Sequence, residues 1–263
     1  MEILLCVKRV PDTSENEIAL NAAGNDIERD DLVYSINEWD NYTVEEALQI
    51  TAKVGGTVTV VTVGGEDDEE VLRREMAMGA THGVLISDDA FTGSDARGIA
   101  TILKAFVEKG KYDLILTGVQ AEDGGALVGG MLAAMLDYPF ASLVNSIEAL
   151  DGKTLKISRE IAGGNKEINQ IDLPCVLSIQ TGINEPRYVG MRGIRQVASI
   201  PIPTLGVSEL NLDPQMVGLA AAKVQRVDYF TPAMGEGAEM LQGSREEVID
   251  KLFELVAAKG GLK

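Results

Sequence analysis

The chain has 263 residues, of which 45% are hydrophobic, so it can bury a large core and is not a disordered polypeptide. Its formal net charge of −18 argues against a nucleic-acid partner, because phosphate backbones would be repelled. One histidine and two distant cysteines exclude a three-histidine metal site and make a disulfide framework improbable.

The first two thirds of the chain alternate short apolar runs with helical patterns, which is typical of βαβ units around a parallel sheet. Strands are predicted at 3–7, 57–63, 83–87 and 113–117. Helices are predicted at 43–53, from Glu66, at 94–109 and after Gly125. We therefore predict an α/β fold with a doubly wound, mostly parallel sheet. No apolar run is long enough to span a bilayer and no signal peptide is evident, so we expect a cytoplasmic protein.

The pattern changes after Pro139. Strand-like runs at 142–150, 154–161, 166–173 and 175–181 are separated by turns at Asp151-Gly152 and Gly163-Gly164. They predict antiparallel hairpins added to the parallel sheet. The chain is irregular from about 184, and one last helix is predicted at 244–258. We expect a domain over 1–185 and a C-terminal arm over 186–263.

The loop that follows the strand at 113–117 is the first candidate site. Ligands of open parallel sheets bind beyond the carboxyl ends of the strands, and Gly124 and Gly125 would let the backbone approach a phosphate. Asp123 would cap the following helix or accept bonds from a ribose or from backbone amides. Neither the dinucleotide-binding motif GxGxxG nor the P-loop motif GxxxxGK(S/T) occurs here. An ordinary glycine-rich connection therefore stays open as an alternative.

The second candidate is the segment at 37–40, which holds the only tryptophan beside polar side chains. Asn37 or Asp40 could bond an adenine edge or a ribose. The alternative is that Asp40 or Asn41 simply caps a helix that starts near Thr43.

The third candidate is the segment at 184–195, which concentrates an aromatic residue, a methionine and three arginines in an acidic chain. These residue types are enriched in recognition surfaces. Alternatively, the arginines merely pair with the abundant carboxylates.

Several segments together carry a family resemblance. They lie at 7–12, 37–40, 44–47, 72–73, 77–80, 118–123, 159–164, 173–174 and 184–188. In order and along nearly the whole chain they resemble the β subunits of electron-transferring flavoproteins, and the segments at 37–40 and 192–196 look closest to the subgroup that serves methylotrophic trimethylamine dehydrogenases. The loop after residue 118 departs from the family pattern by being one residue shorter.

The resemblance implies an adenine-nucleotide α-hydrolase-like sheet that binds AMP structurally. It also implies a heterodimer in which an α subunit holds most of the electron-carrying FAD. The implied AMP-site residues are Cys6, Asn37, Glu38, Trp39, Asp40, Val63, Gly118, Val119, Gln120, Ala121, Asp123, Gly124, Gly125, Ala126 and Val128. The implied recognition residues for a partner dehydrogenase are Tyr188, Met191, Arg192, Ile194 and Arg195, with Met191 at the position of the family's anchoring leucine.

The resemblance makes the chain an electron-carrier subunit with no catalytic residue and no metal of its own. One alternative is a flavin-bifurcating version, in which a second FAD replaces AMP and NADH is the donor. An alternative of another class is a universal-stress-type homodimer that binds ATP.

Overall fold

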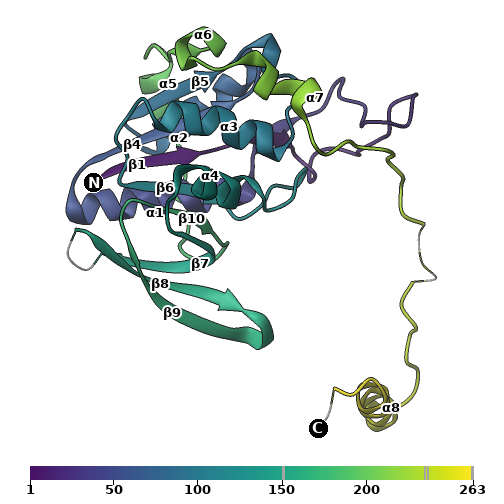
Figure 1. Ribbon diagram of the computed structural model, residues 1–263. Coiled ribbons are helices and arrows are strands. Elements are labelled where there is room, and N and C mark those ends of the chain that lie inside the picture. Colours follow the sequence, from purple (N-terminus) through teal and green to yellow (C-terminus); the bar gives the residue numbers. More distant parts are fainter. Residues whose placement is uncertain (150–151, 234, 236, 262–263) are drawn as a thin grey trace. The chain divides into compact units, whose positions relative to one another are not determined.

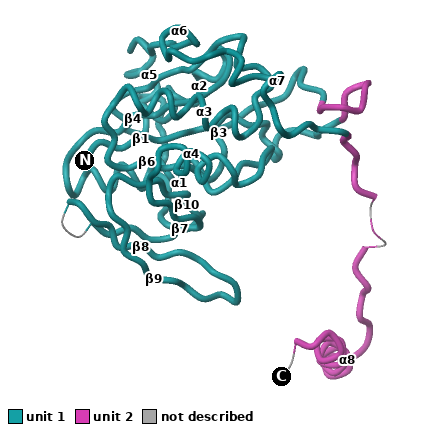
Figure 2. Tube along the Cα trace, in the orientation of Figure 1, with its two compact units in different colours: residues 1–19, 28–227 teal, residues 20–27, 228–263 magenta. Residues whose placement is uncertain are grey.

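The computed structural model describes residues 1–149, 152–233, 235 and 237–261. The chain divides into two compact units, one of residues 1–19 and 28–227 and the other of residues 20–27 and 228–263 (Figure 2). Leu150 and Asp151, which the sequence placed at a strand end and in a turn, lie outside the described residues. None of the helices within the described ranges has the length and apolar character that a membrane crossing requires.

A sheet of nine strands, counted over the described residues, forms the centre of the first unit (Figure 1). Its order is β11-β5-β4-β1-β6-β10-β7-β8-β9. The strands are β1 (Glu2–Cys6), β4 (Thr57–Val63), β5 (His82–Ile86), β6 (Leu114–Gly118), β7 (Phe140–Ala149), β8 (Thr154–Ile161), β9 (Asn165–Asp172), β10 (Cys175–Ile179) and β11 (Thr204–Leu205). Every pair from β11 to β7 is parallel, and β7, β8 and β9 form an antiparallel meander.

Helices cover both faces of the parallel part. They are α1 (Glu38–Val54) and α2 (Glu69–Met78) on one face, and α3 (Ala96–Val107) and α4 (Val128–Leu136) on the other. Successive strand residues point to opposite faces, so Leu5 packs in the core under α1 while Leu4 packs in the core under α3 and α4. Both faces of β4 are buried, which explains its unbroken β-branched sequence. The predicted doubly wound α/β fold is confirmed.

The strand predicted at 175–181, which is β10 in the structure, does not belong to the hairpins. The expectation that 175–181 forms part of the antiparallel addition is wrong, because β10 lies between β6 and β7 and is parallel to both. Its five residues are all buried, as a central parallel strand requires. Its continuous apolar sequence, rather than its neighbours in the chain, marks where it belongs.

The stretch between β1 and α1 contains a small antiparallel ribbon of β2 (Arg9–Pro11) and β3 (Tyr34–Ile36). Shorter elements complete the first unit. They are η1 (Glu66–Asp68), η2 (Asp89–Phe91), η3 (Ala162–Gly164), α5 (Met191–Val197), α6 (Val207–Leu210), η4 (Pro214–Met216) and α7 (Gly218–Ala221). This unit runs on to Val227, and the functional division at residue 185 stays a prediction.

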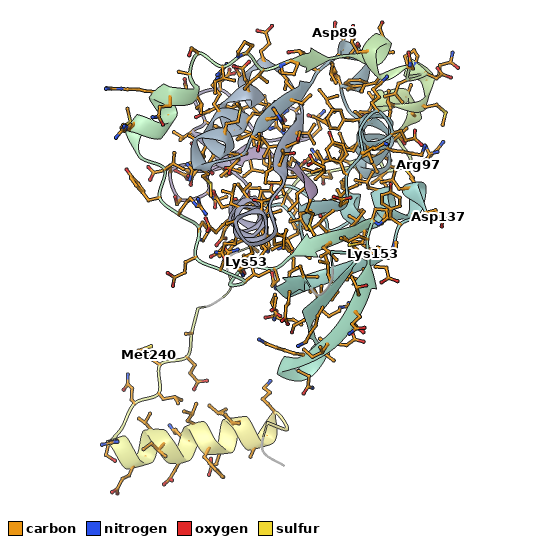
Figure 3. All side chains as sticks on the ribbon, turned by 90° about the vertical axis from the view of Figure 1, so that its left-hand side faces the viewer. Lys53, Asp89, Arg97, Asp137, Lys153 and Met240 are labelled. Carbon is orange, nitrogen blue, oxygen red and sulfur yellow. The ribbon has the colours of Figure 1, made fainter. Side chains whose placement is uncertain are left out.

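The second unit contains α8 (Arg245–Ala258), which confirms the predicted last helix. Ser244 and Glu247 form a reciprocal capping box at its start. No described residue of α8 is buried, and side chains project from all around the helix (Figure 3). Its large apolar side chains are exposed, among them Ile249, Leu252 and Phe253.

Candidate functional site

The strand order reverses beside β1. β4 and β5 lie on one side of this strand, and β6 and β10 lie on the other. The register sets Cys6 opposite Val61 of β4 and Thr117 of β6, so the three carboxyl ends meet at one edge. In doubly wound sheets, ligands bind at this kind of edge.

Asp40 ties the exits of two of these strands together. Its Oδ2 accepts a hydrogen bond from the backbone N–H of Lys8 at 2.8 Å, and its Oδ1 accepts one from the backbone N–H of Gly118 at 3.1 Å. The residue is only 3% exposed. Burial raises the pKa of its carboxyl group to about 7, against the opposing effect of hydrogen bonds from Asn37 and these two amides. Asp40 is thus a structural acceptor that fixes the geometry of the edge.

The capping alternative for this segment is wrong. α1 begins at Glu38, five residues before Thr43, with Asn37 at the cap position and no side-chain capping bond. Asp40 therefore lies inside the first turn. Its carboxylate is engaged by neighbouring strands and is not available to cap the helix.

Asn37 joins α1 to the loop after β6. Its Nδ2 donates to the carbonyl of Gln120 at 2.9 Å, and its backbone N–H donates to the carbonyl of Lys8 at 2.9 Å. Its Oδ1 is buried and has no hydrogen-bond partner among the described residues. A buried acceptor without a donor is uncommon in proteins and points to a bond that the chain alone does not supply.

Gly118 lies where these side chains converge. A Cβ atom there would come within 2.5 Å of Asp40 Oδ1, 2.8 Å of Trp39 Cβ and 3.2 Å of Asn37 Nδ2. Only glycine fits without displacing the cluster. Two candidates that were separate in the sequence, 37–40 and the loop from 118, therefore form one site.

The neighbouring side chains of Glu38 and Trp39 lie in different parts of the structure. The indole Nε1 of Trp39 donates to Gln180 Oε1 at 3.1 Å, just beyond the carboxyl end of β10. Glu38 instead lines a hollow of about 420 Å³ with Arg74 and Tyr188. The structure thus places Trp39 with the strand ends and Glu38 away from them.

The loop from Gly118 to Val128 forms the outer wall of the site. Its residues 122–127 are exposed, and Lys8 Nζ forms an ion pair with Asp123 Oδ1 at 2.6 Å. The expectation that Asp123 could cap the following helix is wrong, because α4 begins at Val128 with Leu127 at its cap position. No side chain caps α4, so its first-turn amides are free of the bond that a cap would make.

The remaining predicted residues occupy neighbouring strand ends. Val63 ends β4, and Val119 is buried just after β6, where its N–H donates to the carbonyl of Ile179. Burial, reinforced by the charge of Asp40, raises the pKa of the Cys6 thiol to about 12. Cys6 is therefore a neutral wall residue and not a nucleophile.

The predicted recognition residues are not part of this cluster. Tyr188 is 92% exposed and Met191 is 64% exposed, and Arg192, Ile194 and Arg195 are exposed on α5. They form a second surface beside α1 and α2.

Sequence reasoning did not predict Lys8 and Gln180 as site residues. Lys8 is the second residue after β1, and Gln180 is the first residue after β10. Their positions immediately after strands of a parallel sheet were the available signal, since polar residues there point into the ligand edge.

The comparisons with known proteins agree with this geometry. Residues 25–210 match the family model of the electron transfer flavoprotein domain. The electron transfer flavoprotein subunit beta of Methylophilus methylotrophus is 34% identical over 97% of this chain and 98% of its own, and that of Bacillus subtilis is 33% identical over 98% of both. The caffeyl-CoA reductase-Etf complex subunit CarD of Acetobacterium woodii is 35% identical over 93% of each chain.

Matches of this extent, on a doubly wound sheet with a polar cluster at its switch point, decide against the universal-stress-type alternative. The chain belongs to the family of electron transfer flavoprotein β subunits, which are electron carriers.

Proposed function

We propose that the chain pairs with an α subunit that holds FAD, and that the heterodimer accepts electrons from a dehydrogenase and passes them on. In this proposal the chain binds AMP structurally at the edge formed by Asn37, Asp40 and Gly118. The observation that carries the proposal is the convergence of these residues at the strand-order reversal, where ligands of such sheets bind.

The residues of this edge suit an adenylate. Asn37 Oδ1 lacks a donor, and the amino group of adenine is a donor of the required kind. The uncapped start of α4 offers backbone N–H groups to a phosphate, and Lys8 offers a positive charge close by. Cys6, Trp39, Val63 and the loop from Gly118 to Val128 would form the walls.

The role of the chain in electron transfer is then one of holding and orienting. When bound, a flavin supplies the reversible storage of electrons, and the protein sets its position and electrostatic surroundings. No acid–base residue of this chain is required for that role.

The α subunit is the proposed partner of α8. Ile249, Leu252 and Phe253 are exposed on this helix, and an apolar helix face is stable only when another surface covers it. The recognition residues Tyr188 and Met191 are proposed to meet the dehydrogenase.

A second candidate has FAD in place of AMP, with NADH as donor and electron bifurcation as the activity. The observation that favours it is the 35% identity to a subunit of a caffeyl-CoA reductase complex, which matches the chain as well as the other relatives do.

Identification of the released nucleotides tests both candidates. The heterodimer would be denatured after purification, and the released FAD and AMP would be counted per heterodimer by chromatography. One FAD and one AMP support the first candidate, whereas two FAD with bleaching by NADH support the second. A single FAD with no other adenine nucleotide would overturn the assignment of the site.

A further inference from the structure

The segment that leads into the recognition residues is held to α1 by charged side chains. Arg187 donates from Nε to Glu45 Oε2 at 2.7 Å and from Nη2 to Glu45 Oε1 at 3.0 Å, a two-pronged ion pair. The backbone N–H of Arg187 also donates to Glu45 Oε2 at 3.2 Å. Asn184 Nδ2 adds bonds to Glu46 Oε2 and to the carbonyl of Tyr42, both at 3.0 Å.

The far end of the same segment is held to α2. Arg73 donates to the carbonyls of Val197 at 2.8 Å and Ile200 at 3.2 Å, and Glu69 fixes Arg73 through an ion pair. Gly193 lies so close to α2 that a Cβ atom there would approach the carbonyl oxygen of Ala77 to 3.1 Å. The recognition segment is therefore a bridge with both ends attached to the same helical layer.

Between these attachments the side chains point outward. Tyr188, Met191 and Ile194 are exposed, whereas Val189 packs against the core and Val197 is buried. An exposed apolar group in a short segment stays in one place only if the backbone beneath it is fixed.

We propose that Glu45 is a positioning residue for partner docking, and that its ion pair with Arg187 holds Tyr188, Met191 and Ile194 in the arrangement that a dehydrogenase recognises. This inference rests on the proposed role of the recognition segment. It adds a residue of α1 that lies outside the proposed nucleotide site at Asn37, Asp40 and Gly118 and acts on docking only through the recognition segment.

The environment of the pair explains why it is effective. Burial would raise the pKa of the Glu45 carboxyl group, but the hydrogen bonds from Arg187 and Gln49 outweigh burial and lower the pKa below its usual value. Glu45 is thus an ionised carboxylate with little access to water, and two-pronged arginine–carboxylate pairs are the more strongly directional kind. Loss of the Arg187 guanidinium would leave this carboxylate buried without a counter-charge, which is more damaging than loss of the pair as a whole.

The test uses the intact heterodimer and the dehydrogenase that reduces it. The dehydrogenase would be purified from the source cells by following its reduction of the heterodimer. Glu45→Gln is expected to raise the KM for the heterodimer roughly tenfold, the effect of one lost charged bond, with kcat and flavin content unchanged. Backbone amide hydrogen–deuterium exchange of residues 184–197 should be faster in this variant.

Variants of Arg187 test the same pair from its other side. Arg187→Gln alone should raise the KM more than the double variant Glu45→Gln/Arg187→Gln does. The KM of Arg187→Lys should lie between those of Arg187→Gln and the wild type.

Two controls separate the possible outcomes. Glu108→Gln removes a surface ion pair with Lys104 on α3 and should change neither KM nor exchange. If Met191→Ala raises KM and Glu45→Gln does not, the positioning role is overturned while the docking surface stands. If neither variant changes KM, the docking assignment itself falls.

Discussion

At the scale of single residues, the proposed nucleotide site depends on two neighbouring positions at the start of α1 and on one that lies 78 residues beyond Asp40. Asp40, Asn37 and Gly118 lie on two elements, and their fit leaves no room for a methyl group at position 118. The cluster is therefore sensitive to the smallest possible substitution, and this sensitivity can be measured.

We expect Gly118→Ala to destabilise the first unit by about 1–3 kcal/mol, because the new Cβ atom must displace Asp40 or Trp39. The heterodimer should also lose most of its adenine nucleotide while it keeps the flavin of the α subunit. Thermal unfolding and nucleotide content measure the two effects. Gly65→Ala is the matched control, since a Cβ atom there meets only Asp68 Oδ2 at 3.9 Å, and equal behaviour of the two variants would contradict this account.

Glu75 is a buried carboxyl group whose ionisation affects the stability of the fold. It is 0% exposed, its two carboxylate oxygens lack hydrogen-bond partners among the described residues, and Arg74 Nε lies 3.9 Å from Oε1. Burial raises the pKa of this carboxyl group to about 8; the charge of Arg74 opposes this effect and that of Asp40 adds to it. Glu75 is therefore protonated in the folded protein at neutral pH.

A raised carboxyl pKa makes the free energy of unfolding fall as the pH rises. Below pH 4.5 both states keep the proton of Glu75, whereas between pH 4.5 and about 8 the unfolded chain releases it and the folded chain does not. We expect Glu75→Gln to remove this loss, so that the difference in unfolding free energy between variant and wild type shifts in favour of the variant from pH 5 to pH 8, by roughly 3 kcal/mol between pH 4.5 and pH 7. Denaturant unfolding at several pH values measures it. The exposed Glu66→Gln is the control, and a gain that does not vary with pH would refute the assignment.

The sequence predicted which segments lie at this edge of the sheet better than it predicted their contacts. The loop at 118–128 and the segment at 37–40 were identified from strand ends and family resemblance. The pairs Lys8 with Asp123 and Glu45 with Arg187 span 115 and 142 residues, so no local pattern could indicate them. The alternative in which Asp40 or Asn41 caps the helix was wrong because α1 begins at Glu38, and the Asp40 carboxylate accepts bonds from Lys8 and Gly118, which are distant in the sequence.

At the scale of elements, strand and helix positions followed from apolar patterns, but their pairing did not always do so. β10 was recognised as a strand, yet its place between β6 and β7 depends on the connection that brings it back to the centre of the sheet. α4 shows how closely such elements fit, because its second residue, Gly129, rests on the hydroxyl groups of Thr117 and Ser178. These two hydroxyls are 2.9 Å apart and join β6 to β10.

We expect Gly129→Ala to push α4 away from the sheet, because the Cβ atom would lie 2.6 Å from Ser178 Oγ and 2.7 Å from Thr117 Oγ1. The predicted loss is about 1–3 kcal/mol, even though alanine is the better helix former by up to about 1 kcal/mol. Gly130→Ala, whose Cβ atom meets only the Phe140 ring at 3.4 Å, should be neutral or slightly stabilising. Urea unfolding of the pair decides the matter, and equal losses would show that backbone flexibility and not contact is responsible.

At the scale of the whole molecule, the two units differ in how they are stabilised. The first has two buried clusters on the faces of its sheet, whereas α8 in the second has no buried residue. Composition and apolar patterns were enough to predict both the α/β core and the last helix. They could not predict what covers α8, because an apolar helix face shows that a covering surface is needed but does not say which surface it is.

Deletion from Pro232 onward tests whether the first unit is stable by itself and whether α8 is needed to bind the α subunit. The shortened chain should keep the secondary structure and melting temperature of the first unit, because no residue of its two clusters is removed. It should no longer copurify with the α subunit, since the exposed Ile249, Leu252 and Phe253 are lost. Leu252→Ser/Phe253→Ser in the full chain is the matched variant, because it keeps the capped helix and removes only apolar contact. Copurification of the shortened chain at wild-type yield would show that the α subunit binds the first unit alone, and α8 would then need another partner.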